Sequence, residues 1–137
     1  MMLTDAGPLI AVIDRADSLH LRAVSFLRSL RESPFVTTWP CLSEAMHILA
    51  GVGGHGYQTP VWTLRDTNRL IILDLTSGEV DRMIGLMAKY HDRPMDLADA
   101  SLVAVAEARG FKQIFTFDSD FRVYRLADGT VLDVVPH

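Results

Sequence analysis

Short unbroken hydrophobic runs alternate along the chain with longer stretches in which apolar residues lie three or four positions apart. The short runs predict buried strands at 2–5, 35–39, 69–75, 113–117 and 131–135. Helical spacing predicts a short helix after the Gly7-Pro8 turn and longer helices at 18–32, 40–51, about 57–67, 77–90 and 97–110. Strands that alternate with helices form βαβ units, in which the strands run parallel and helices cover both faces of the sheet. The pattern therefore predicts an α/β fold with three layers, α/β/α, around a central, mainly parallel sheet.

The length and composition are typical of one soluble domain. We expect residues 1–137 to form a single domain, because no linker or change of composition divides the chain. Hydrophobic residues make up 49% and charged residues 22%, which excludes a disordered protein. The net charge of −4 argues against general electrostatic binding of nucleic acid or an anionic membrane, but leaves a locally bound nucleic acid open. The N-terminus predicts no signal peptide, no apolar run approaches the ~20 residues of a membrane span, and the single Cys41 fits a reducing cytoplasm.

Two carboxylates stand at the start of the helix predicted at 97–110, and we interpret them differently. Asp96 precedes an unbroken helix-forming run, so it is predicted to cap the helix N-terminus. Asp99 is the third helical residue, and the residues three, four and seven positions after it are apolar. A carboxylate that faces the interior is costly without a positive partner, and no Lys or Arg stands within one turn of it. Asp99 therefore needs a cation from elsewhere in the fold, or a metal ion.

Four acids from distant parts of the chain are predicted to meet at one edge of the sheet. Asp5 ends the first strand, and Asp118 follows the strand at 113–117. Glu44 and Asp99 each lie near the start of a helix that follows a strand. The carboxyl ends of parallel strands share one edge of a sheet, and ligands bind outside that edge. The positions of these acids therefore indicate a functional site.

The chemistry of such a cluster points to a divalent metal ion. Neighbouring carboxylates raise each other's pKa unless a cation offsets their charge. Oxygen ligands suit Mg²⁺ or Mn²⁺, whereas Zn²⁺ is more often held by His or Cys. The chain has no Walker lysine motif, and no G-x-G-x-x-G follows its first strand. Hydrolysis of a phosphodiester is therefore favoured over the use of a nucleotide cofactor.

The acids lie within an ordered set of four stretches that nearly span the chain: "LTDAGPLIAVID", "LSEAMHIL", "PMDLADASLVAVAEARG" and "IFTFDSDFRVY". In these stretches and their order the sequence resembles the PIN-domain ribonucleases, and most closely the VapC-type toxins of bacterial toxin–antitoxin pairs. The family's acidic residues carry over to Asp5, Glu44, Asp99 and Asp118. One departure is that Ala6 and Gly7 follow the first Asp, where the family often has a hydroxyl residue or Asn.

The resemblance implies a PIN-like domain that cleaves RNA endonucleolytically with Mg²⁺ or Mn²⁺. Asp5, Asp99 and Asp118 are expected to hold the metal. Glu44 is expected to position or deprotonate the attacking water, or to complete the metal's ligands. The expected biological role is a toxin silenced by a cognate antitoxin protein, with a homodimer as the unit.

Several other polar residues have a structural interpretation that we favour. Asp120 is interpreted as a solvated capping residue, because Asp118 comes first after the strand. The glycine-rich stretch 51–57 is interpreted as a helix stop followed by a mobile loop, since it lacks the Lys-Ser/Thr of a phosphate cradle. The stretch 121–126 could guide a phosphate backbone with its two arginines, but a short packed helix is favoured. Four arginines are interpreted as solvating one helix face: Arg15, Arg22, Arg28 and Arg31.

Two other functions stay open at this point. A metal-dependent phosphatase on a similar sheet could use an Asp nucleophile after the first strand. Such enzymes usually need a lysine near the phosphate, and "MLTDAG" lacks the D-x-D pattern of one such group. A catalytically inactive PIN-like binding module is the second alternative, and the intact acidic set argues against it.

Overall fold

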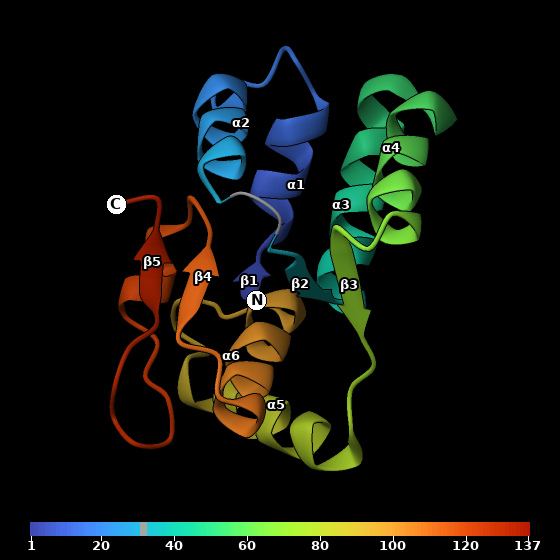
Figure 1. The fold of residues 1–137 in the computed structure, drawn as a ribbon. Coiled ribbons are helices and arrows are strands. Elements are labelled where there is room, and N and C mark those ends of the chain that lie inside the picture. Colours follow the sequence, from blue (N-terminus) through green and yellow to red (C-terminus); the bar gives the residue numbers. More distant parts are fainter. Residues whose placement is uncertain (31–32) are drawn as a thin grey trace.

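The fold is described from a computed structural model, which covers residues 1–30 and 33–137. Five strands form one sheet in the order β3-β2-β1-β4-β5, and every neighbouring pair is parallel (Figure 1). They are β1 (Met2–Thr4), β2 (Phe35–Thr38), β3 (Leu70–Leu73), β4 (Gln113–Phe115) and β5 (Asp133–Val135). Each strand lies within its predicted range. The predicted α/β fold with a parallel sheet is confirmed.

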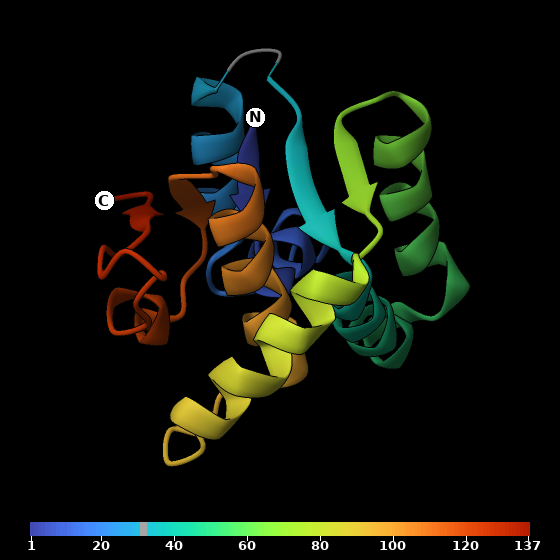
Figure 2. The ribbon, with the colours of Figure 1, turned by 90° about the horizontal axis from the view of Figure 1, so that it is seen from below.

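Helices cover both faces of this sheet (Figures 1 and 2). One face carries α1 (Ala6–Ile13), α2 (His20–Ser29), α3 (Trp39–Gly53) and α4 (His55–Asp66), and the other carries α5 (Ser77–Lys89) and α6 (Leu97–Arg109). Alternate strand residues point to opposite faces. Phe35 and Phe115 therefore join the core beneath α1 to α4, whereas their neighbours Val36 and Ile114 join the core beneath α5 and α6. The three predicted layers are thus confirmed.

Among the described residues, no helix combines the length and the apolarity needed to cross a membrane. The prediction for 18–32 matches α2, except that its last residues, including Arg31, lie outside the described part of the chain.

The mobile loop predicted at 51–57 is wrong. Helix α3 continues to Gly53, and α4 begins at His55. Gly54 alone joins them, with φ at 69° and its N–H bonded to the carbonyl of Ala50 at 2.9 Å. A glycine adopts this left-handed backbone without steric cost, so one residue can reverse the chain between two helices.

The stretch 121–126 contains part of a packed helix, as predicted. The 3-10 helix η1 spans Ser119–Arg122, and so begins two residues before that stretch. Its Phe121 is buried, as is Tyr124 just beyond it. These aromatic side chains close the core next to the carboxyl end of β4.

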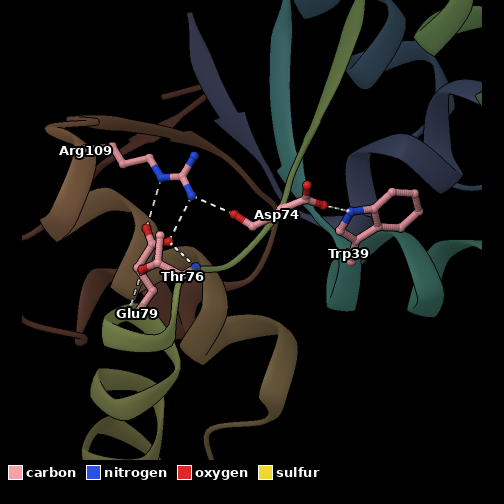
Figure 3. A network of polar contacts seen from close by, with 5 residues as sticks. All are labelled: Trp39, Asp74, Thr76, Glu79 and Arg109. Carbon is pink, nitrogen blue, oxygen red and sulfur yellow. Dashed lines mark hydrogen bonds and ion pairs between the residues drawn. The ribbon is translucent and has the colours of Figure 1, made fainter.

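A polar network joins the loop after β3 to three helices (Figure 3). The Trp39 indole at the start of α3 donates to the Asp74 carboxylate at 2.7 Å, and Arg109 of α6 donates to the Asp74 carbonyl at 2.6 Å. Arg109 also donates two hydrogen bonds to Glu79, at 2.8 and 3.0 Å. Glu79 completes a capping box with Thr76 at the start of α5. Hydrogen bonds from Arg109 lower the pKa of the buried Glu79 to about 2, so this network is ionised and holds the elements together at neutral pH.

Candidate metal centre

Asp5 lies where β1 meets α1, at the carboxyl edge of the sheet. Its backbone N–H donates to the carbonyl of Phe115 at 3.0 Å, which ties the end of β1 to β4. One carboxylate oxygen caps α1 by accepting the Ala6 N–H at 2.8 Å. The other accepts the hydroxyl of Thr116 at 2.9 Å. Asp5 is only 8% exposed, so both hydrogen bonds orient a nearly buried carboxylate.

Asp99 lies in the first turn of α6, which follows α5 and not a strand as expected, and Asp96 caps that helix as predicted. The Asp96 side chain accepts the Asp99 N–H at 2.8 Å. The Asp99 carboxylate is 7% exposed and accepts the hydroxyl of Tyr124 at 2.9 Å. Among residues 1–30 and 33–137, Asp99 therefore meets a neutral hydroxyl group and none of the basic side chains that sequence analysis called for.

Asp118 follows β4 and is more exposed than the other two acids. It caps η1 by accepting the Asp120 N–H at 2.9 Å. Its own backbone N–H donates to the Thr116 hydroxyl oxygen at 3.0 Å. Thr116 therefore links Asp5 to Asp118 through one hydroxyl group.

The structure brings three of the four predicted acids together. Carboxylate oxygens of Asp5, Asp99 and Asp118 lie within 4.8 Å of one another. Within residues 1–30 and 33–137, none of the three forms an ion pair with Lys, Arg or His. The repulsion within the group is thus not offset by a basic side chain of the described residues.

This electrostatic environment changes the acidity of the site. Burial raises the pKa of Asp99 to about 8, and the charges of Asp96, Asp5 and Asp118 add to that effect. Burial also raises the pKa of Asp5, and the nearby Asp118 contributes. The pKa of Tyr124 is raised by burial and by its hydrogen bond to Asp99, so it stays a hydrogen-bond donor.

Glu44, the fourth predicted acid, lies on α3 outside the group of three. Burial raises its pKa first, and the charges of Asp96, Asp5 and Asp118 raise it further. Glu44 therefore shares the electrostatic field of the site. The interpretation of Asp120 as a capping residue is wrong, because Asp118 caps η1 and the Asp120 carboxylate instead forms an ion pair with Arg93 at 2.9 Å.

The residues at the site fit a hard divalent cation. All three groups offer carboxylate oxygens, which Mg²⁺ and Mn²⁺ prefer. An ion at this position would offset the charge that no basic side chain among the described residues offsets, and so permit all three acids to ionise.

Two site residues were missed by sequence analysis. Thr116 and Tyr124 both donate to the predicted metal ligands, across 111 and 25 positions of sequence. A hydroxyl residue two positions before Asp118 was the only local signal for Thr116. Nothing in the local pattern distinguished Tyr124 from an ordinary core aromatic residue.

The family model described as PIN domain matches residues 2–126. The chain belongs to the PIN domain family. The predicted resemblance to this family is confirmed, and solved VapC toxins are among the structures with a similar fold. A comparison with curated proteins finds no match.

Three solved structures illustrate the likeness of this PIN domain to known folds. VapC20 of Mycobacterium tuberculosis, described as a Sarcin-Ricin loop cleaving toxin, has a TM-score of 0.80 and 19% identity, covering 90% of this chain and 94% of that one. A toxin–antitoxin complex from Klebsiella pneumoniae has a TM-score of 0.61 and 17% identity, covering 87% and 88%. VapBC2 from Rickettsia felis, bound to a DNA fragment from the promoter of the pair, has a TM-score of 0.65 and 12% identity, covering 97% and 96%. At these identities the likeness concerns the fold.

Proposed function

We propose that this PIN domain is a metal-dependent endoribonuclease and the toxin of a toxin–antitoxin pair. The observation that carries the proposal is the group formed by Asp5, Asp99 and Asp118, whose carboxylate oxygens lie within 4.8 Å of one another at the carboxyl edge of the sheet. An oxygen-only site for a hard cation suits phosphodiester hydrolysis.

In the proposed site Asp5, Asp99 and Asp118 hold Mg²⁺ or Mn²⁺. The bound ion would supply polarisation of a phosphate oxygen and a lower pKa for a coordinated water. Thr116 and Tyr124 orient the carboxylates of Asp5 and Asp99 through their hydroxyl groups. This reduces the rearrangement that the acids need before they can bind a cation.

Glu44 is proposed to position the attacking water and take its proton. A general base works best when its pKa lies near the working pH. Burial and the charges of neighbouring acids raise the pKa of Glu44, which moves it toward that range. Once the proton has moved to Glu44, the hydroxide attacks the phosphorus and the bond between phosphorus and the leaving oxygen breaks. The leaving oxygen takes up a proton from water, and the hydroxide so formed takes the proton back from Glu44.

The biological role is supported by the kind of proteins that share the fold. Solved structures with a similar fold include a toxin described as cleaving the Sarcin-Ricin loop and complexes described as toxin–antitoxin or VapBC. We therefore propose an RNA substrate, an antitoxin partner and the cytoplasm as the place of action. A homodimer as the functional unit stays a prediction from the family resemblance.

The test is cleavage of total RNA by the purified protein, with Mg²⁺ and with EDTA. We expect cleavage at defined sites only with the metal, and we expect Asp5→Ala and Glu44→Gln to abolish it while remaining folded. Asp96→Asn is the matched control, because Asn also caps a helix and should retain most activity. Wild-type expression should arrest growth, and Asp5→Ala should not.

Two results would contradict the proposal. Growth arrest by a folded Asp5→Ala variant would favour a binding module over a nuclease. Hydrolysis of phosphomonoesters without cleavage of RNA would favour the phosphatase.

A further inference from the structure

We propose that Arg22 and Arg122 form a phosphate subsite beside the metal centre, which holds the RNA phosphate next to the one that is cleaved. This inference rests on the proposed nuclease function and extends it to substrate contact. The observation behind it is a cavity of about 180 Å³ whose wall contains both arginines together with Thr116, Asp118 and Ser119. Because Thr116 and Asp118 also belong to the metal centre, the cavity and the centre share a wall.

The two arginines reach this cavity from different elements. Helix α2, which carries Arg22, lies beside the carboxyl ends of β4 and β5 (Figure 1). The Arg22 guanidinium lies 5.4 Å from the centroid of the Phe117 ring, in a cation–π contact that orients it. Arg122 ends η1, the 3-10 helix that Asp118 caps. The segment after β4 therefore supplies a metal ligand, the ring that orients Arg22, and Arg122 itself.

Neither arginine has an ion-pair partner among residues 1–30 and 33–137. Three other arginines do pair with buried or partly buried acids: Arg82, Arg93 and Arg109. The charge of Arg122 contributes to the lowered pKa of Asp133, but that carboxylate bonds to Gln113 and His137 instead. Within the described part of the chain, Arg22 and Arg122 are thus both available to bind an anion that belongs to another molecule.

A backbone phosphate is the anion that this position favours. The guanidinium group binds phosphate with two parallel hydrogen bonds and keeps its charge at all relevant pH values. A phosphate near Asp5, Asp99 and Asp118 is repelled by them, so a substrate strand needs positive charge beyond the bound ion. Phosphate contacts place a nucleic acid strand in register without reading its sequence. Arg22 and Arg122 would in this way place the scissile bond over the metal centre.

The test uses a short RNA with one cleavage site, mapped first with the wild-type protein. In two further RNAs, the phosphodiester on one or the other side of that site is replaced by a neutral methylphosphonate. We expect one of the two replacements to lower the wild-type kcat/KM about 10-fold, since a hydrogen-bonded charge is lost. On the unmodified RNA, the kcat/KM of the Arg22→Gln/Arg122→Gln double variant should be lower than that of the wild type by a similar factor. The methylphosphonate should then lower the kcat/KM of the double variant little further, because the arginines that contact this phosphate are already absent.

Two further variants and one stability measurement complete the design. Arg28 lies on the same helix as Arg22 but outside the cavity, so Arg28→Gln should have the kcat/KM of the wild type on each RNA. Arg22→Lys/Arg122→Lys keeps both charges and should recover much of the lost kcat/KM. Each variant should have the same thermal unfolding temperature as the wild type, which would show that the substitutions leave the fold unchanged.

The outcomes separate this inference from the proposed function. If the wild type does not cleave RNA, the proposed function fails and the subsite fails with it. If the wild type cleaves RNA but the double variant is as sensitive to the methylphosphonate as the wild type, the subsite alone is wrong. The subsite is also wrong if the double variant cleaves RNA normally and instead loses affinity for the antitoxin, because the cavity then takes a protein carboxylate.

Discussion

Replacing Asp99 with Asn should stabilise the metal-free protein, and the gain should grow as the pH rises. Asp99 is 7% exposed, and burial together with the charges of Asp96, Asp5 and Asp118 raises its pKa from 3.8 to about 8. The folded protein therefore binds this proton more tightly than the unfolded chain does. Its contribution to stability is greatest below pH 3.8, declines as the pH rises toward 8, and is then constant.

The magnitude follows from the size of the pKa shift. A difference of about 4 pKa units at about 1.4 kcal/mol each amounts to roughly 6 kcal/mol. The stability that the wild type loses as Asp99 ionises is smaller than this if the ionised carboxylates move apart or water enters between them. Asn keeps an oxygen that can accept the Tyr124 hydroxyl but carries no charge, so the variant escapes this loss. We therefore expect the stability difference between variant and wild type to rise by about 1 kcal/mol per pH unit.

The assay is urea unfolding of wild type and Asp99→Asn at several pH values from 5 to 8 in EDTA. Asp96→Asn is the comparison variant: it keeps the helix cap but removes one of the charges that raise the pKa of Asp99, so its stability should depend on pH less steeply than that of the wild type. Saturating Mg²⁺ at pH 7 should then stabilise the wild type and leave Asp99→Asn nearly unchanged. A stability difference between Asp99→Asn and wild type that stays constant from pH 5 to pH 8 would refute the reasoning.

Two further substitutions test the network and the site. Arg109→Met should lower the free energy of unfolding by about 3 kcal/mol, since it leaves the buried Glu79 unpaired. Urea unfolding should show that this loss shrinks as the pH falls from 4.5 to 2, because Glu79 then becomes protonated in the wild type as well. The matched Arg65→Met removes an exposed ion pair and should cost less than about 1 kcal/mol. Thr116→Val should cost about 1–3 kcal/mol because it removes the hydroxyl partner of Asp5, and calorimetry should show weaker Mg²⁺ binding; unchanged affinity would mean that Thr116 does not orient that carboxylate.

The layers of the fold were predictable because hydrophobic periodicity is a local signal. Each strand lies within the range that its apolar run predicted, and the convergence of Asp5 and Asp118 follows from the rule that parallel strands end at one edge. The junction of α3 and α4 was not predictable in the same way. A glycine-rich stretch is compatible with a loop or with a sharp turn, and only the packing of the two helices selects the positive φ of Gly54.

The surroundings of the acids were beyond local analysis. The hydroxyl group of Thr116 reaches Asp5 only because β4 pairs with β1. Arg22 was interpreted as solvating its helix, which its spacing in the helix supports. Its place in the cavity depends on how α2 lies against the end of β4, and no pattern within α2 records that arrangement.

Glu79 and Asp99 show why an acid at a helix start cannot be assigned a role from its own segment. Both occupy the third position of a helix behind a side-chain cap, and both are nearly buried, at 4% and 7% exposure. Their pKa values nevertheless lie far apart, at about 2 and about 8. The difference comes from residues distant in sequence. Glu79 pairs with Arg109 (Figure 3), whereas Asp99 lies beside two further carboxylates. A paired buried acid stabilises the fold by itself, but a buried acid among other acids stabilises it only when a cation arrives. This contrast, within one protein and at one helix position, supports a structural role for Glu79 and a binding role for Asp99.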